Sequence, residues 1–386
     1  MYNRKLVFWA ACLGMLLFGI VMISLGTINT FLTEKFQLDQ QTVGSLAALL
    51  PFGILAGSLI FGPICDRYGY KGLLIISTIL ILIGVEIIAF AKSFSVLRYA
   101  FFLIGFGGGI INGGTNAVVS DISAEEKGAK LSLLGVFFGI GALGMPVLVG
   151  ALSKYFSTER IVMCVGLLIV VPIVFFSLVR FPEPKHNQGF PLKQGLGLLK
   201  NGTLILFGII LFFESGMEGM VSNWSTTYLE KHLFLTSKDA LYALSFVMLG
   251  MTVSRIFLGY LLTKVRDYII LLVCIVIIIC AALILRFAGS FQVAIIGLTL
   301  FGVGFSPAFP VLYGYAGNLY AQYSGTAFSI ILTIALLGNT FLNYSIGVIS
   351  DNYGIEHYLT VILISAVIML ILVGLITKRT LSKLKI

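Results

Sequence analysis

The stretch LLIISTILILIGVEIIAFAK, residues 73–92, carries only Glu86 and Lys92 as charged residues. The hydrocarbon core of a bilayer, about 30 Å thick, is crossed by a helix of about 20 apolar residues. Hydrocarbon offers no partner for backbone amide and carbonyl groups, so a stretch of this kind must be helical. Residues 73–92 are therefore predicted to form a membrane-spanning helix.

Similar apolar stretches recur along the whole chain of 386 residues, which is 59% hydrophobic and only 11% charged. They lie near residues 6–32, 43–65, 97–120, 129–153, 160–180, 202–229, 240–263, 268–288, 291–315, 324–349 and 357–377. This composition is far from that of a soluble domain. We predict an all-α integral membrane protein with twelve transmembrane helices.

The longest polar stretch, RFPEPKHNQGFPLKQGLGLLK at residues 180–200, falls between the sixth and seventh predicted spans. It predicts an N-terminal six-helix bundle at 1–180, a cytoplasmic linker at 181–201 and a C-terminal six-helix bundle at 202–386. Small residues are concentrated in the fourth span (GFGGGIINGGTNAVVSD) and the tenth (FGVGFSPAFPVLYGYAGN). Internal repeats with a site near mid-membrane are typical of secondary transporters.

The net charge of +9 is unevenly placed. If the N-terminus is cytoplasmic, most Lys and Arg residues fall in connections on the inner side, as the positive-inside bias requires. We therefore expect a multi-pass protein of the cell inner (plasma) membrane with both termini cytoplasmic. The excess of cations is explained by this orientation and by contact with anionic membrane lipid, so no nucleic acid is expected as a partner.

Features of an enzyme are missing from the sequence. The five cysteines are scattered without the spacing of a disulfide framework or zinc site, and the three histidines lack ligand spacing. No nucleotide-binding loop is found, because the glycines at 105–109 follow no strand and lie inside a predicted span. No cofactor, metal ion or catalytic residue is expected.

The loop GPICDRYGYKG, residues 62–72, resembles the signature loop of the major facilitator superfamily, G-x-x-x-D-R-x-G-R-K. Tyr70 stands where the family usually has Arg, and a degenerate copy, SRIFLGYLLTKVRD with Arg255, lies at the end of the eighth span. The resemblance implies two pseudo-symmetric six-helix bundles that work by alternating access, commonly as a monomer.

Four charged residues in and near this loop are candidates for a gate: Asp66, Arg67, Lys71 and Asp121. Asp66 can face the positive end of a neighbouring helix. Arg67 is expected to pair with a carboxylate, for which Asp121 is the obvious candidate. The alternative is a loop that only anchors the orientation of the chain.

The seventh span, FFESGMEGMVSNWSTTYL at residues 212–229, is similar to the G-x-E-x(5)-W-x(3)-Y-L pattern of the fucose–galactose–glucose:proton symporter branch. The matching residues are Gly216, Glu218, Trp224, Tyr228 and Leu229. The resemblance implies import of a sugar together with a proton, although some animal relatives use sodium. The chain departs from the branch in being short and in lacking an acidic residue in its first span.

Two acidic residues, Glu214 and Glu218, are four positions apart on one face of the seventh span. Charged side chains at this depth are costly and suggest function. Repulsion between two carboxylates favours proton uptake by one of them, so both are candidates for coupling to H⁺ or Na⁺. Alternatively, Glu218 pairs with a distant arginine and only holds helices together.

Amides inside the spans are candidates for binding a hydroxyl-rich substrate, because they both donate and accept hydrogen bonds. The candidate substrate-binding residues are Asn29, Asn112, Asn116, Asn223, Trp224, Asn339 and Asn343. The alternative is hydrogen bonding between helices, at about 0.6 kcal/mol each. Elsewhere, Glu86 and Arg98 are expected to form an ion pair.

The favoured function is secondary-active transport of a small polar solute, a sugar or sugar derivative, coupled to H⁺ or Na⁺. A proton-coupled exporter of drugs or amphipathic metabolites is the main alternative, and the asparagines weigh against it. A non-transporting receptor is disfavoured because no span connection can hold a soluble domain. Substrate identity, the coupling ion, transport direction and oligomeric state stay open.

Overall fold

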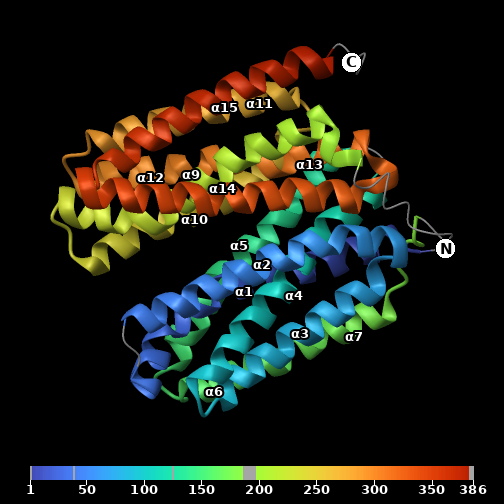
Figure 1. Ribbon diagram of the computed structural model, residues 1–386, viewed down its shortest axis with the longest axis horizontal. Coiled ribbons are helices and arrows are strands. Elements are labelled where there is room, and N and C mark those ends of the chain that lie inside the picture. The colour runs from blue at the N-terminus through green and yellow to red at the C-terminus, as the bar shows by residue number, and fades with distance from the viewer. Residues whose placement is uncertain (1, 38–39, 124–125, 186–196, 382–386) are drawn as a thin grey trace. The chain divides into compact units, whose positions relative to one another are not determined.

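A computed structural model describes residues 2–37, 40–123, 126–185 and 197–381, and these are helical almost throughout (Figure 1). The helices are α1 (Arg4–Phe36), α2 (Gln40–Tyr68), α3 (Tyr70–Phe90), α4 (Phe94–Ile122), α5 (Lys127–Leu152), α6 (Thr158–Leu168), α7 (Val170–Leu178), η1 (Leu198–Lys200), α9 (Gly202–His232), α10 (Ser237–Leu261), α11 (Asp267–Arg286), α12 (Phe291–Phe305), α13 (Ala308–Leu319), η2 (Ala321–Tyr323), α14 (Ser324–Tyr353) and α15 (His357–Leu381). Twelve segments within these residues are long and apolar enough to span a membrane. The predicted all-α membrane fold is confirmed.

Two of the predicted spans are interrupted. The tenth is divided into α12 and α13 at Ser306–Pro307, where proline lacks the amide that would continue the helical hydrogen bonding. The sixth is divided into α6 and α7 at Ile169, shortly before Pro172 in the first turn of α7. By contrast, α5 continues through Pro146 without a break.

The described chain forms two compact units. The first contains Met1–Ala124, Phe137–Gly195 and Gly317–Ser329, and the second contains Glu125–Val136, Leu196–Ala316 and Ile330–Ile386. Each unit therefore includes a short segment from the opposite half of the sequence. Helix α5 begins in the second unit and continues in the first, whereas α14 begins in the first unit and continues in the second.

Packing inside the two units follows the same plan. In the first unit, α4 packs against α1, α2 and α3, and α3 also packs against α6 and α7. In the second, α12 packs against α9, α10 and α11, and α11 packs against α15 (Figure 1). These helices occupy equivalent positions in the sequence of the two halves, so the packing repeats as the sequence does.

Glycines allow the central helix of each unit to approach its neighbour closely. A Cβ atom on Gly105 or Gly109 of α4 would collide with the α2 backbone at Leu50 or Ile54. In the second unit, a Cβ on Gly302 of α12 would collide with the α10 backbone at Val247. Small residues have this role in membrane proteins, where close packing rather than the hydrophobic effect holds helices together.

We predict that Gly109→Ala lowers the thermal stability of the purified protein, because the added methyl group must push α4 away from α2. Overpacking of this kind costs about 1–3 kcal/mol. The measurement is the melting temperature in detergent. Gly150→Ala is the control, since a Cβ on Gly150 of α5 meets nothing within 4 Å. Equal melting temperatures for the two variants would contradict the prediction.

Candidate functional site

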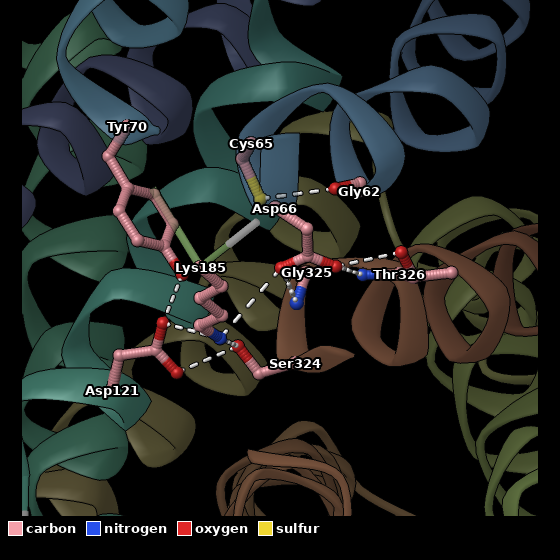
Figure 2. A network of polar contacts seen from close by, with 9 residues as sticks. All are labelled: Gly62, Cys65, Asp66, Tyr70, Asp121, Lys185, Ser324, Gly325 and Thr326. Atoms are coloured by element: carbon pink, nitrogen blue, oxygen red, sulfur yellow. Dashed lines mark hydrogen bonds and ion pairs between the residues drawn. The ribbon is translucent and has the colours of Figure 1, made fainter. Parts of the chain in front are cut away.

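A cluster of charged and hydroxyl side chains in the first unit contains two of the candidate gate residues (Figure 2). This Asp66 cluster consists of Asp66, Tyr70, Asp121, Lys185, Ser324, Gly325 and Thr326. Its members come from α2, α3, α4, the segment after α7 and the first turn of α14. The turn between α2 and α3 is made by Gly69, whose φ of 79° favours glycine.

Asp66 accepts hydrogen bonds from the first turn of α14. The donors are the amide of Gly325 at 3.2 Å, the amide of Thr326 at 2.8 Å and the Thr326 hydroxyl at 2.7 Å. Amides in a first turn have no acceptor within their own helix, and the helix dipole favours an anion there. The Asp66 side chain is fully buried, and its carboxylate caps α14. This agrees with the expectation that Asp66 faces the positive end of a neighbouring helix.

Asp121 is bound by three different groups. Lys185 Nζ lies 2.7 Å from its carboxylate, the Ser324 hydroxyl donates to it at 2.7 Å, and the Tyr70 hydroxyl also donates to it. The same Nζ atom lies 3.8 Å from Asp66. Lys185 is thus the cation that the two carboxylates share.

The predicted ion pair between Arg67 and Asp121 is wrong. Arg67 is exposed and its guanidinium lies 4.9 Å from the ring centroid of Tyr68. Lys71 is also outside the cluster, since its Nζ donates to the carbonyl of Ser177 at 2.7 Å. Lys185 was not among the gate residues expected from the sequence. Tyr70 could have indicated that a cation comes from elsewhere, because it replaces an arginine of the signature loop and so removes one positive charge near the carboxylates.

The second unit contains Glu214 and Glu218, which we call the acid pair. Glu214 is fully buried on α9, and neither of its carboxylate oxygens has a hydrogen-bond partner among the described residues. Arg255 on α10 is 8% exposed, and its charge acts on both Glu214 and Glu218. Arg255 was expected from the sequence only as part of the degenerate loop copy, but it lies within α10 and takes part in this group.

Four of the candidate substrate-binding residues form an amide–indole cluster in the second unit: Asn223, Trp224, Asn339 and Asn343. Asn343 Oδ1 accepts from Asn223 Nδ2 at 3.0 Å and from Trp224 Nε1 at 3.2 Å. Asn343 Nδ2 donates to the carbonyl of Asn339 at 2.8 Å, and Asn339 Nδ2 donates to the carbonyl of Ser215 at 2.8 Å. The cluster links α9 to α14.

The remaining candidates lie in the first unit. Asn116 Nδ2 donates to the carbonyl of Asn112 at 2.8 Å and to its side-chain oxygen at 3.1 Å, so this pair is joined along α4. Asn29 is on α1, but its side chain is outside the described part of the structure. The structure therefore brings the asparagines together within each unit as predicted by their spacing, and their role in binding stays a prediction.

Glu86 and Arg98 do not form the predicted ion pair. Arg98 is exposed at the start of α4, where its guanidinium lies 5.5 Å from the ring centroid of Phe94. Glu86 Oε1 is buried without a hydrogen-bond partner in the described chain, and its carboxylate lies against Gly166 of α6.

Comparison with known proteins identifies the class. The family model of the Major Facilitator Superfamily matches residues 10–342, so the chain belongs to this superfamily and is a multi-pass membrane transporter rather than an enzyme. The chain is 24% identical to the glucose/mannose transporter GlcP of Bacillus subtilis over 349 residues, which cover 85% of this chain and 84% of GlcP.

Solved structures of this superfamily share the fold. A crystal structure of the transporter FucP in the outward conformation aligns with a TM-score of 0.81 at 17% identity, covering 96% of this chain and 98% of FucP. The proton:xylose symporter XylE bound to 6-bromo-6-deoxy-D-glucose aligns with a TM-score of 0.78 at 15% identity, covering 97% and 95%.

We predict that Lys185→Gln loosens the Asp66 cluster, because it leaves two carboxylates without their shared cation. Cys65 is the native reporter, since it is 1% exposed and its thiol donates to the carbonyl of Gly62 at 3.3 Å beside the cluster. In protein that retains Cys65 alone, the reaction with a water-soluble maleimide should become about ten-fold faster or more, as expected for loss of a charged hydrogen bond of ~1.5–3 kcal/mol.

The control for this measurement is Lys200→Gln, which removes the same charge from an exposed residue of η1. It should leave the labelling rate of Cys65 unchanged. Equal rates for Lys185→Gln and the unmodified protein would show that Lys185 does not hold the cluster together.

Proposed function

We propose that this transporter imports a small polar solute, a sugar or sugar derivative, together with H⁺. The amide–indole cluster carries the proposal. Trp224 offers an aromatic face, and Asn223 is exposed beside it with amide donors and an acceptor. An aromatic surface with a few fixed polar groups is the usual means of orienting a small polar ligand.

The comparisons support a sugar as the substrate class. GlcP is described as a glucose/mannose transporter, and the structural neighbours FucP and XylE are described as fucose:proton and proton:xylose symporters. The pair Asn112 and Asn116 on α4, together with Asn29, is proposed to bind further hydroxyl groups of the substrate. Asn339 and Asn343 are proposed to bind the substrate as well, and Asn343 also holds Trp224 by accepting a hydrogen bond from its Nε1 atom.

Coupling is proposed to occur at Glu218 and Glu214. A buried carboxylate without hydrogen-bond donors is costly as an anion, and uptake of a proton removes this cost. H⁺ is proposed as the coupling ion because a proton needs only one carboxylate oxygen, and both oxygens of Glu214 lack hydrogen-bond partners among the described residues.

The remaining elements of the proposal concern orientation and gating. The two halves, residues 1–180 and 202–386, are proposed to move as bodies during alternating access, with 181–201 as their cytoplasmic linker. Asp66 and Asp121 are proposed as gate residues, and Arg67 and Lys71 as cations that anchor the same loop. The distribution of Lys and Arg supports an inner-membrane location with both termini cytoplasmic and in contact with anionic lipid. A monomer is proposed because the superfamily commonly works in this form.

The test of coupling is uptake into proteoliposomes that contain a pH-sensitive dye. D-Glucose, D-mannose, L-fucose and D-xylose are added outside, first with no ion gradient and then with a pH or sodium gradient. We expect at least one sugar to drive proton entry, and Glu218→Gln to abolish this entry while sugar exchange continues, because glutamine imitates the protonated acid. Glu230→Gln, at the end of the same helix, is the matched control.

Proton entry that persists in Glu218→Gln would exclude this residue as the coupling site. Sugar uptake driven by sodium alone would replace H⁺ with Na⁺ in the proposal. Transport of amphipathic compounds without any response to the four sugars would favour the exporter instead.

We further predict that sugar binding changes the fluorescence of Trp224. The chain has two tryptophans, and Trp9→Phe leaves Trp224 as the only one. Gly219→Ala should weaken the sugar affinity measured from this fluorescence change about ten-fold or more. The reason is that a Cβ there would lie 2.5 Å from the Nδ2 atoms of both Asn339 and Asn343. Gly374→Ala, where a Cβ meets nothing within 4 Å, should leave the affinity unchanged. Equal sugar affinities of the Gly219→Ala and Gly374→Ala variants would show that the amide–indole cluster does not bind the sugar.

A further inference from the structure

Arg255 of α10 contacts helix α5 within the second unit, and its charge also acts on Glu214 and Glu218. Its Nη1 atom donates to the carbonyl of Gly135 at 3.3 Å, and its backbone carbonyl accepts a hydrogen bond from the Ser132 hydroxyl at 2.8 Å. Its Nε atom is buried and has no hydrogen-bond partner in the described part of the chain. One guanidinium donor is therefore used by α5, while another is unused.

The charges of the acid pair and of Arg255 do not balance. Glu214 and Glu218 carry two negative charges when both are ionised, and Arg255, whose guanidinium stays charged, carries one positive charge. Among the described residues, Arg255 is the charged group that acts on the pair from a neighbouring helix. Uncompensated charge in an apolar interior is strongly unfavourable, so the group is balanced only when it holds one additional positive charge.

We propose that Arg255 transmits the protonation state of the acid pair to α5, with one proton bound per acid pair. With one carboxyl protonated, the guanidinium remains hydrogen-bonded to Gly135. When that proton leaves, the second carboxylate attracts the guanidinium, and the hydrogen bond to Gly135 breaks. This inference rests on the proposed ion coupling at Glu218 and Glu214 and adds Arg255 as the positioning residue.

Helix α5 is suited to receive this signal. Its residues up to Val136 belong to the second unit, and its residues from Phe137 onward belong to the first. Gly135 is the next-to-last residue before this change. A displacement of Arg255 at Gly135 therefore acts on a continuous helix that contributes to both units.

Glycine at position 135 leaves room for the guanidinium beside α5. A Cβ atom there would lie 3.0 Å from Cδ and Nη1 of Arg255 and 3.1 Å from its Nε. These distances are tighter than ordinary van der Waals contact, so Gly135→Ala displaces the guanidinium while it leaves all three charged groups in the protein. Gly144→Ala on the same helix is the matched control, because its Cβ meets nothing within 4 Å.

The first measurement counts bound protons and needs no substrate. Infrared titration of the full-length protein in detergent detects protonated carboxyl groups, and the difference between the native protein and Glu214→Gln/Glu218→Gln isolates the acid pair. We expect one protonated carboxyl in the native protein and in Arg255→Lys, which keeps the charge. Arg255→Gln should contain two, because both carboxylates then lack a counter-ion. A single protonated carboxyl in Arg255→Gln would overturn the proposal.

The second measurement follows α5 by hydrogen–deuterium exchange of the peptide spanning residues 127–136, corrected for the intrinsic effect of pH. In the native protein and in Gly144→Ala, exchange should rise several-fold at the pH where the pair loses its proton. Arg255→Lys and Gly135→Ala should lose this response, because the link to α5 is broken while the proton is retained. A response that persists in both variants, or is absent from the native protein, would overturn the proposal.

These readouts separate the two proposals. If protons and α5 respond as described but none of the four sugars drives proton entry, the role of Arg255 is supported and the sugar:proton function fails. If sugar drives proton entry but α5 does not respond to pH, the function is supported and the role of Arg255 is overturned.

Discussion

A polar group that leaves water must find a partner inside the protein, and this constraint governs every level of this structure. For the backbone the partner is the helical hydrogen bond, which is why the apolar stretches are helices throughout the described chain. For charged side chains the partner must be another charge or a set of hydrogen-bond donors. The three charged residues that are buried in the described chain, Asp66, Glu214 and Arg255, consequently lie in two groups, one around Asp66 and one around Arg255.

Close helix packing allows such groups to form. Gly62 of α2 and Gly325 of α14 are in contact, and a Cβ on Gly325 would lie 2.8 Å from Asp66 Oδ1. This proximity lets the Asp66 carboxylate reach the first amides of α14. At Gly135 and Gly219, the missing side chain likewise makes room for a guanidinium and for two amides. Glycine thus serves both the packing of the helices and the placement of polar groups between them.

The fold was predictable from sequence because the length and composition of an apolar stretch are local properties. The interruption of the tenth span lies at Pro307, a residue that cannot continue helical hydrogen bonding. The family loop likewise indicated that Asp66 would face a helix end, which the structure shows to be that of α14. Partners of long charged side chains were not predictable, because they depend on distances between helices. Thus Arg67 and Arg98 lie over aromatic rings of nearby residues rather than on the expected carboxylates.

The candidate site was predictable to the same extent. Residues spaced four apart on one helix, such as Asn339 and Asn343, are adjacent in the structure because helical geometry alone determines this. Lys185 and Arg255 could not be assigned in this way. The first is close to Asp121 only through the path of the segment after α7, and the second is separated from Glu214 in sequence and shares a site with it only through helix packing.

The two charged groups have the same formal balance, two carboxylates and one cation, but they differ in hydrogen bonding. In the Asp66 cluster, amides and hydroxyls donate to Asp66, and the hydroxyls of Tyr70 and Ser324 donate to Asp121. These donors offset part of the cost of burying the two carboxylates. Glu214 has no such donor within the described residues, so nothing but charge can compensate it. Hydrogen bonding therefore makes the first group suited to a fixed ionic contact, and its absence makes the second suited to binding and releasing a proton.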